Sequence, residues 1–113
     1  MNQRDLIREI LATYRKHGWR LRRVLLVPET RAEVVNEDEL TFEGARVEVA
    51  NVNALWFSRP SHGKREAWEL RLIAETAYAL FEIFEADEPE ETHDGVRQEM
   101  QVKLGEFTSR KRP

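Results

Sequence analysis

Residues 53–73, NALWFSRPSHGKREAWELRLI, constrain the fold more than any other part of this 113-residue chain. The middle of the segment, PSHGK, contains a proline and a glycine, two residue types that favour tight turns. On both sides of it apolar and polar side chains alternate, which is the period of a β-strand. We therefore predict a central β-hairpin at about residues 53–73.

The returning half of this hairpin also fits a second interpretation. Residues 66–86 contain neither glycine nor proline, and Arg71, Glu75 and Tyr78 recur at helical spacing, so a long helix packed on a smaller sheet is the alternative. Against a helix, Trp68 and Leu70 alternate with polar residues. We expect two strands here. The second strand would place three side chains on one face: Ala79, Phe81 and Ile83.

An amphipathic helix is predicted at residues 3–16, before the hairpin. Its apolar stripe follows the helical period and consists of Leu6, Ile7, Ile10, Leu11 and Tyr14. A strand follows at residues 19–27, where an apolar, β-branched run stops at Pro28. Residues 29–45 are acidic and mixed, and we expect a helical turn near Thr30 and then a loop.

The remaining elements complete an α+β fold. Residues 46–57 alternate as a strand does, with an interruption near residues 51–53. Residues 92–104 predict a helix, because Val96, Met100 and Leu104 share a face. The fold class is thus α+β, with an N-terminal helix, a predominantly antiparallel sheet of about four or five strands and a C-terminal helix. We expect one domain over residues 1–108 and a mobile basic tail over residues 109–113.

Several classes of protein are excluded by what the sequence lacks. The absence of cysteine excludes disulfides, thiol catalysis and cysteine zinc sites. No apolar run approaches the roughly 18 residues of a membrane span, and the N-terminus lacks a signal-peptide pattern, so we expect a soluble cytoplasmic protein without a membrane. Phosphate-binding glycine loops and activated-serine motifs are missing, so we expect no cofactor.

The titratable side chains point to no particular chemistry. His17, His62 and His93 lack metal-ligand spacing, so we predict no metal site, and the sequence leaves open whether the three meet in space. Glu69 and Glu82 would form an acid–base pair if they faced each other across adjacent strands, but nothing in the sequence selects them. An enzyme would require a concave pocket in which a histidine meets a carboxylate. We expect no catalytic activity.

Charge is distributed unevenly along the chain. The net charge is only −3, yet residues 1–31 carry eight Lys or Arg against three acids, whereas residues 82–99 carry eight acids and one Arg. Blocks of opposite sign steer partners or pair with each other. This pattern suits a charge-complementary homodimer or a protein partner.

Interaction with protein, or self-association, is the function that we expect from these features. Tryptophan and arginine are the residue types that anchor interfaces, and the hairpin carries both. The hypothesis requires an apolar patch around Trp56 and Trp68 that stays exposed in the monomer. The candidate binding residues are Trp56, Phe57, Arg59, His62, Trp68 and Arg71.

Binding of single-stranded nucleic acid or of a small ligand through the Arg/Trp-rich strands is the alternative function. Aromatic side chains stack on bases, and cations neutralise phosphates. The nucleic-acid face would consist of Arg20, Arg22, Arg59, Lys64 and Arg65. A pI near 5.7 makes this alternative less favourable, because the acidic segment repels a polyanion unless it lies on the opposite face.

Overall fold

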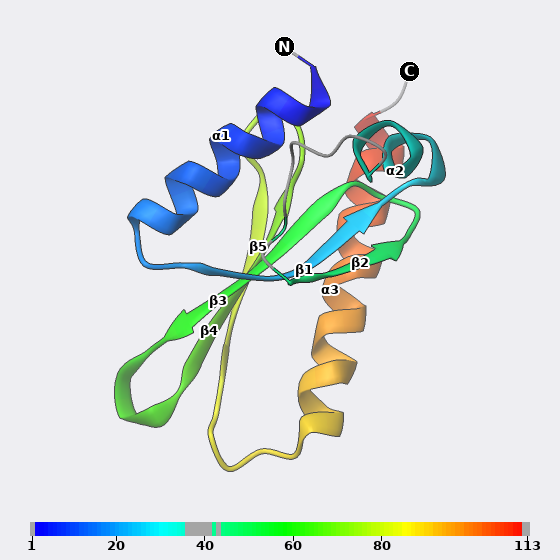
Figure 1. The fold of residues 1–113 in the computed structure, drawn as a ribbon. Helices are drawn as coiled ribbons and strands as arrows, with labels where there is room; N and C mark the ends of the chain where they lie inside the picture. Colours follow the sequence, from blue (N-terminus) through cyan, green and yellow to red (C-terminus); the bar gives the residue numbers. More distant parts are fainter. Residues whose placement is uncertain (1, 36–41, 43, 112–113) are drawn as a thin grey trace.

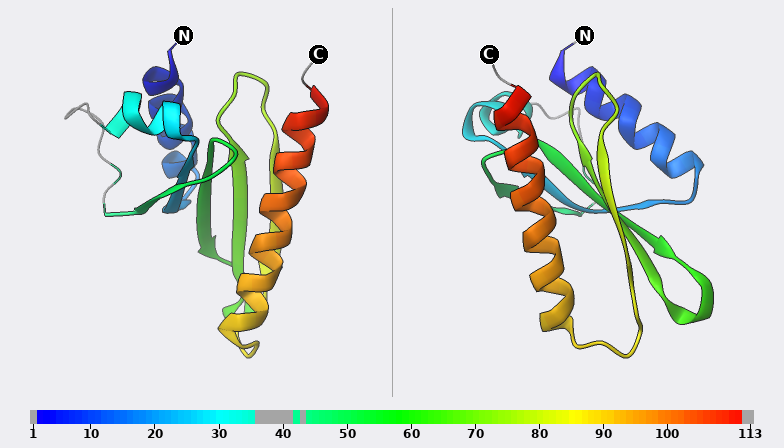
Figure 2. Two further views of the ribbon diagram at one scale, coloured as in Figure 1. Left: turned by 90° about the vertical axis from the view of Figure 1, so that its right-hand side faces the viewer. Right: turned by 180° about the vertical axis from the view of Figure 1, so that it is seen from behind.

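The structure, a computed structural model, describes residues 2–35, 42 and 44–111. Its elements in chain order are α1 (Gln3–Lys16), β1 (Arg20–Leu26), α2 (Pro28–Val35), β2 (Arg46–Val49), β3 (Ala54–Pro60), the short 3₁₀ turn η1 (His62–Lys64), β4 (Glu66–Leu72), β5 (Ala79–Phe84) and α3 (Glu90–Lys111). They form three layers, with α1 and α2 on one side of a sheet and α3 on the other (Figures 1 and 2).

The sheet has five strands in the order β2-β1-β3-β4-β5. Only β1 and β2 run parallel, and the other neighbours are antiparallel. This arrangement, with a helix at each end of the chain, confirms the α+β class and the predominantly antiparallel sheet.

The predicted hairpin is confirmed as β3 and β4, which pair from Ala54 with Leu72 to Pro60 with Glu66. Residues 66–86 form the strands β4 and β5, so the long-helix alternative is wrong. The alternation explains this outcome: Leu70 is fully buried beneath α3, whereas Glu69 points to the opposite face, toward α1. In a helix, Glu69 would instead have fallen among the apolar side chains of the buried face.

Residues 46–57 form two strands that are not neighbours, because β1 lies between β2 and β3. The predicted interruption therefore separates two strands. Asn53 stabilises the bend: its Oδ1 accepts a hydrogen bond from the backbone N–H of Val27 (2.8 Å), and its Nδ2 donates one to Thr30 Oγ1 (3.0 Å). One side chain thus links the start of β3 to the beginning of α2, and Thr30 lies in a full helix of eight residues.

Both faces of the sheet are apolar, and each is covered by helix. The face toward α1, called the α1 face here, includes Val24, Leu26, Leu55 and Phe57, which pack with α1 and α2. The opposite α3 face includes Leu25, Trp56, Trp68, Leu70 and Phe84, which pack with Met100 and Leu104 of α3. β3 is the central strand, and its residues 54–58 are buried on both faces.

A β-bulge in β1 brings two adjacent arginines to one face. The register with β3 shifts between Leu21 and Arg23, so the normal alternation is interrupted at this point. Arg22 donates to Ser58 Oγ (3.1 Å), and Arg23 pairs with Asp94 of α3 (3.7 Å). Both arginine side chains therefore lie on the α3 face.

The first helix is bounded by local signals, and the last helix is longer than predicted. α1 begins at Asn2, whose side chain accepts a hydrogen bond from Asp5 N (2.8 Å), and it stops where Gly18 adopts a positive φ of 84°. α3 is longer than the predicted residues 92–104, and it includes residues 109–111, which we had expected in the tail. Residues 112–113 lie outside the described residues. Within the described part of the chain, no helix combines the length and the apolar content that a membrane span requires.

Candidate binding site

A cleft of about 600 Å³ opens between α1 and β4 on the α1 face of the sheet. α1 packs over β1 and the core beneath it, so the cleft forms where β4 passes beside the helix. The lining is mixed: the apolar side chains are Leu6, Ile10, Trp19 and Ala77, and the polar ones are Glu9, Thr13, Tyr14, His17, Glu69, Arg71 and Glu75. We call it the α1–β4 cleft.

A hydrogen bond between Tyr14 and Glu69 crosses this cleft. The hydroxyl group of Tyr14 donates to Glu69 Oε2, and the tyrosine ring stacks on Phe57 with 4.1 Å between centroids. Burial is the main cause that raises the pKa of Tyr14 above its ordinary value of 10.0, and the bond to Glu69 adds to it. Tyr14 therefore remains a neutral donor at neutral pH, and it holds the carboxylate of Glu69 in one orientation.

Arg71 lies beside this pair and supports the end of β4. Its Nη1 donates to the backbone carbonyls of Leu72 and of Ala74, the latter at 3.4 Å. The chain leaves β4 just there: Ala74 N donates to the carbonyl of Leu72 (3.1 Å), and the guanidinium adds a second donor to that carbonyl. Its positive charge stays next to Glu69.

Trp19 lines one end of the cleft, and Arg59, which is not part of the lining, packs against its ring. The guanidinium carbon of Arg59 lies 4.4 Å from the centroid of the Trp19 ring, and Arg59 Nη1 donates to the carbonyl of His17 (2.8 Å). A cation bound at the last carbonyls of α1 also complements the helix dipole. On its other side, Trp19 meets the edge of Phe81 from β5, with 6.4 Å between centroids.

His17 also lines the cleft, at the end of α1. Its Nδ1 lies 2.9 Å from the carbonyl oxygen of Thr13 and donates a hydrogen bond to it. In the neutral ring, Nε2 is therefore the nitrogen without a proton. No ion pair joins His17 to a carboxylate among the described residues. The cleft therefore contains both a histidine and carboxylates, without the direct contact that an acid–base pair requires.

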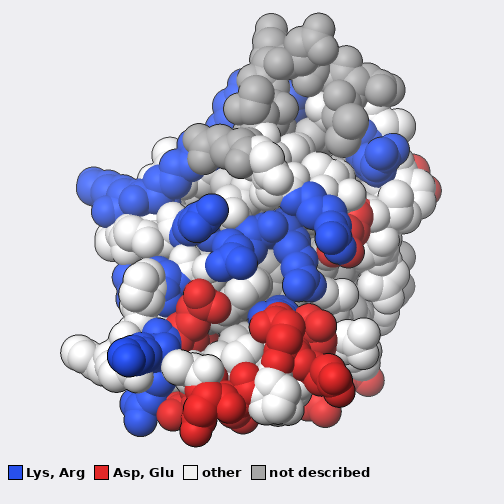
Figure 3. All heavy atoms as spheres, turned by 60° about the horizontal axis from the view of Figure 1, so that its bottom comes forward, with Lys and Arg blue, Asp and Glu red and all other residues white. Residues whose placement is uncertain are grey.

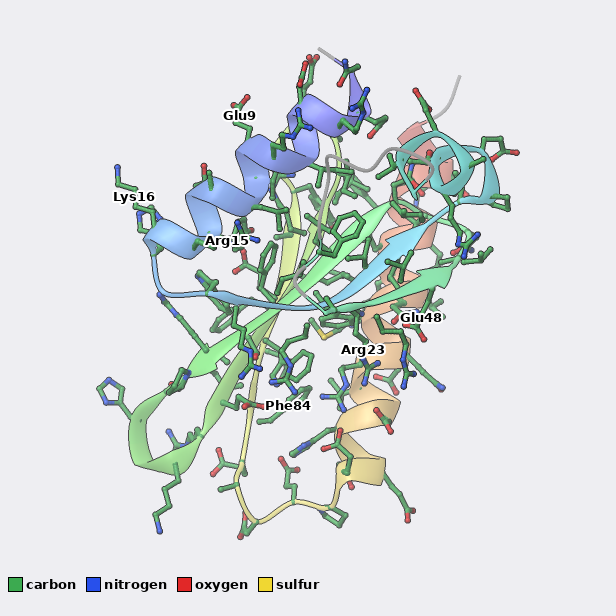
Figure 4. The ribbon with its side chains drawn as sticks, in the orientation of Figure 1. Glu9, Arg15, Lys16, Arg23, Glu48 and Phe84 are labelled. Atoms are coloured by element: carbon green, nitrogen blue, oxygen red, sulfur yellow. The ribbon has the colours of Figure 1, made fainter. Side chains whose placement is uncertain are left out.

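The charges around the cleft favour a cationic ligand. Glu9, Glu69 and Glu75 contribute three carboxylates, and Arg71 is the only lining side chain with a permanent positive charge. Glu9 projects from α1 away from the sheet, so it lies on the rim (Figure 4). Glu69 accepts the Tyr14 hydrogen bond through one oxygen, which leaves its second oxygen for another donor.

A second polar cluster lies on the α3 face. Arg97 is only 2 % exposed; its guanidinium lies 4.4 Å from the centroid of the Trp68 ring, and it donates to Glu90 and to Asp94 (2.8 Å). Arg23 points toward the same region (Figure 4). The hydrogen bond from Arg97 is the main cause that lowers the pKa of Asp94 below its ordinary value of 3.8.

The basic side chains around this second cluster form ion pairs with acidic side chains of the same molecule. Figure 3 shows a band of basic side chains next to an acidic group on this side of the molecule. Arg22 lies 3.9 Å from Glu66, and Arg46 lies 3.8 Å from Glu48. Because the cations have acidic partners and Arg97 is buried, we regard this cluster as a link between α3 and the sheet.

The six residues that the sequence suggested for binding are dispersed. Trp56, Phe57 and Trp68 are at most 3 % exposed, so the expectation of an exposed tryptophan patch is wrong. Trp56 and Trp68 share the α3 face because their strands pair in register, and both pack beneath α3. Arg71 lines the α1–β4 cleft, and Arg59 borders it through Trp19. His62 is exposed in the turn η1, away from the cleft.

The single nucleic-acid face that we considered is also absent from this arrangement. Arg20 pairs with Ser58 and so shares the α3 face with Arg22, whereas Arg59 lies on the α1 face. Lys64 lies in the turn, and Arg65 pairs with Glu85 (2.9 Å). Alternation along β1 and β3 thus places these cations on opposite sides of the sheet.

The structure also separates the carboxylates and the histidines that the sequence left open as possible pairs or clusters. Glu82 pairs with Trp68 and therefore faces α3, on the opposite side from Glu69, so these two carboxylates form no pair. The three histidines occupy separate places: His17 at the cleft, His62 in the hairpin turn, and His93 against Phe84 with 4.5 Å between the rings. The described residues include no group of three His, Asp or Glu arranged to hold a metal ion.

Sequence reasoning missed Tyr14, Trp19, Glu69 and Glu75 as site residues. One signal was present: Glu69 is a charged residue between Trp68 and Leu70, in a strand whose flanking positions are apolar. Because helices cover both faces of this sheet, a charge on either face is expensive unless a partner meets it. The partner, Tyr14, belongs to the apolar stripe of α1, and only the fold brings the two together.

The fold and this site define a three-layer α+β protein with an acidic surface cleft beside its first helix. No family model, no curated protein and no solved structure matches the chain.

Proposed function

We propose that this protein is an interaction module that binds a basic side chain of a partner protein in the α1–β4 cleft. The observation that carries the proposal is the carboxylate of Glu69, held by Tyr14 in a cleft that also contains Glu9 and Glu75. A lysine or arginine would bring the complementary charge, and hydrogen bonds between charged groups are the strong ones.

The walls of the cleft suit such a side chain in a second way. Leu6 and Ile10 provide apolar surface for the aliphatic stem of a lysine or arginine. Trp19 offers an aromatic ring, although Arg59 already lies against it. The cleft therefore matches both the stem and the head of a basic side chain.

A protein partner fits the cleft better than a free small molecule does. Small ligands are usually bound in sites that bury most of their surface. Glu9, Thr13, His17, Glu75 and Ala77, which line the cleft, are all exposed, so the cleft is open to the surface. A side chain presented by a partner would be enclosed by the partner's own surface.

Selection of peptides tests the proposal. A phage-displayed library of random linear peptides is panned against the protein, and the selected peptides are measured by isothermal titration calorimetry. We expect them to carry lysine or arginine, and to lose at least about tenfold in affinity toward the Glu69→Gln variant, because one charge-assisted bond is lost. The amide oxygen of that variant still accepts the Tyr14 hydrogen bond, so its fold is retained.

Glu91→Gln is the matched control, since Glu91 is an exposed carboxylate of α3 outside the cleft. It should leave the affinity unchanged. Selected peptides without basic residues, or equal binding to the Glu69→Gln variant, would contradict the proposal. Free argininamide that binds as tightly as the selected peptides would contradict a protein partner.

A further inference from the structure

The outer edge of the sheet at β5 has little of the protection that edge strands usually carry, because Glu82 is its single charged residue. Five of its six residues, ALFEIF, are apolar, and it contains no lysine or proline. Proteins usually protect an edge strand with such residues, because its unpaired backbone groups attract another strand. Phe81, in the middle of β5, is 53 % exposed. The edge is therefore a good candidate for pairing with another strand.

Two backbone hydrogen bonds near the end of β4 indicate which backbone groups of β5 face this edge. Ile73 N donates to Asn53 O (2.9 Å), toward β3, and Leu72 N donates to Tyr78 O (3.0 Å), toward the chain that enters β5. Bonding direction alternates along antiparallel strands. The even-numbered residues of β5 therefore bond to β4. The N–H and C=O groups of Ala79, Phe81 and Ile83 point to the free edge.

This edge is complementary to itself. If β5 of a second copy approaches antiparallel, with Phe81 opposite Phe81, then Ala79 of each copy lies opposite Ile83 of the other. These are the residues whose backbone groups are free, so the two strands would exchange a full set of hydrogen bonds. Aromatic and β-branched cross-strand pairs are also favourable. In this register Glu82 lies opposite Leu80, so no like charges face each other directly.

Charge supports the same register on the α3 face. Glu82 points to that face, as its partner Trp68 does. On that face Leu80 lines a groove together with Lys103, Glu106 and Arg110 of α3. The groove therefore contains two basic side chains and one acidic side chain. Lys103 forms no ion pair with any residue that the structure describes. Glu82 of a second copy would therefore reach a groove that holds Lys103.

We propose that two copies of this protein join β5 to β5 in this register, so that one sheet runs through both, with Glu82 of each copy paired to Lys103 of the other. This inference goes beyond the proposed function and does not rest on it. The cleft lies over β4, one strand inward from the contact.

A charge exchange tests both the dimer and its register. Size-exclusion chromatography with light scattering is run on the wild type, on Glu82→Lys, on Lys103→Glu and on an equimolar mixture of the two variants. We expect the wild type at twice 13.3 kDa. Each variant alone should dissociate at least about tenfold more readily, because like charges then meet twice. The mixture should regain the dimer, because both contacts between the two variants are attractive.

A second pair of variants separates the edge from the rest of the surface. Phe81→Lys should abolish the dimer, whereas Val102→Lys, at a somewhat more exposed position on α3, should leave it intact. Glu69→Gln should also leave it intact, so failure of the cleft proposal and failure of the dimer are distinguishable. A monomeric wild type, a dimer insensitive to Phe81→Lys, or a mixture of the charge variants that stays monomeric would each overturn the inference.

Discussion

The hydroxyl group of Tyr14 donates a hydrogen bond to the carboxylate of Glu69, 55 residues further along the chain. This contact joins the first helix to the fourth strand, and the stacking of Tyr14 on Phe57 holds the ring in place. The cleft thus depends on one tyrosine for its shape and for the orientation of its central carboxylate.

Tyr14→Phe should lower the free energy of unfolding by about 1–2 kcal/mol, because it removes one half-buried hydrogen bond to a charged group and keeps the ring. Urea denaturation at neutral pH measures the difference. Tyr78→Phe is the control, since the Tyr78 ring stacks on Phe107 and its hydroxyl forms no hydrogen bond with the described residues. Equal stability of the Tyr14→Phe variant and the wild type would contradict this prediction.

Alkaline pH should weaken the same contact. The pKa of Tyr14 is raised in the folded state, mainly by burial, so its contribution to stability is fully present below the ordinary value of 10.0 and is lost as pH rises through the folded value. The wild type should therefore lose stability above about pH 10 more steeply than Tyr14→Phe. Urea midpoints over this range provide the comparison, and parallel curves for the two proteins would argue against it.

Arg97 should be replaceable by an apolar side chain of similar length but not by a small one. It is 2 % exposed and packs on Trp68, and its Nε has no hydrogen-bond partner among the described residues. Arg97→Ala should cost about 2–4 kcal/mol, because it leaves a cavity beside that ring. Arg97→Met should remain within about 1 kcal/mol of the wild type, because it removes a buried charge and keeps the packing. Thermal and urea unfolding measure both variants, and an equal loss in the two would be inconsistent with this account.

Asp94 should contribute to stability at neutral pH and lose that contribution in acid. The hydrogen bond from Arg97 lowers the folded pKa of Asp94, so its contribution is present above the ordinary value of 3.8 and is lost as pH falls through the lower folded value. Asp94→Asn should be less stable than the wild type at neutral pH, and the difference should shrink below about pH 4. A difference that stays constant as the pH falls would refute the linkage.

Gln101→Leu should destabilise the protein by about 1–3 kcal/mol, because it leaves a buried donor without a partner. Trp56 is fully buried, and its Nε1 donates to Gln101 Oε1 at 3.0 Å. Gln98→Leu, an exposed neighbour on the same helix, is the control and should change stability little. Chemical denaturation monitored by tryptophan fluorescence measures both. A cost for Gln101→Leu no larger than that for Gln98→Leu would count against the role of this bond.

The elements that sequence reasoning predicted well have local signals. The stripe of α1 and the hairpin of β3 and β4 follow from side-chain period and turn residues within about 20 positions. No local signal predicted which strand lies next to β2. The position of β1 between β2 and β3 depends on the parallel pairing of β1 with β2. Parallel pairs join segments that are distant in the chain, and no turn marks them.

The candidate site was harder to predict than the fold. Trp56 and Trp68 carry the composition of an interface, yet their pairing register turns both toward α3 and buries them. Alternation predicts that two sets of side chains point to opposite faces, but it does not predict which face a helix covers. Glu69 stood out as a charge between apolar residues, and its partner lay in a separate element.

The sequence by itself determined the first helix, the position of the central hairpin and the α+β class, because each follows from the spacing of apolar residues along a short segment. The tertiary structure decided the strand order, the face on which each tryptophan and arginine lies, and the meeting of Tyr14 with Glu69. These outcomes depend on strand register, where a shift of one residue reverses every side chain. The bulge between Leu21 and Arg23 is such a shift, and it brings Arg22 and Arg23 to one face of the sheet.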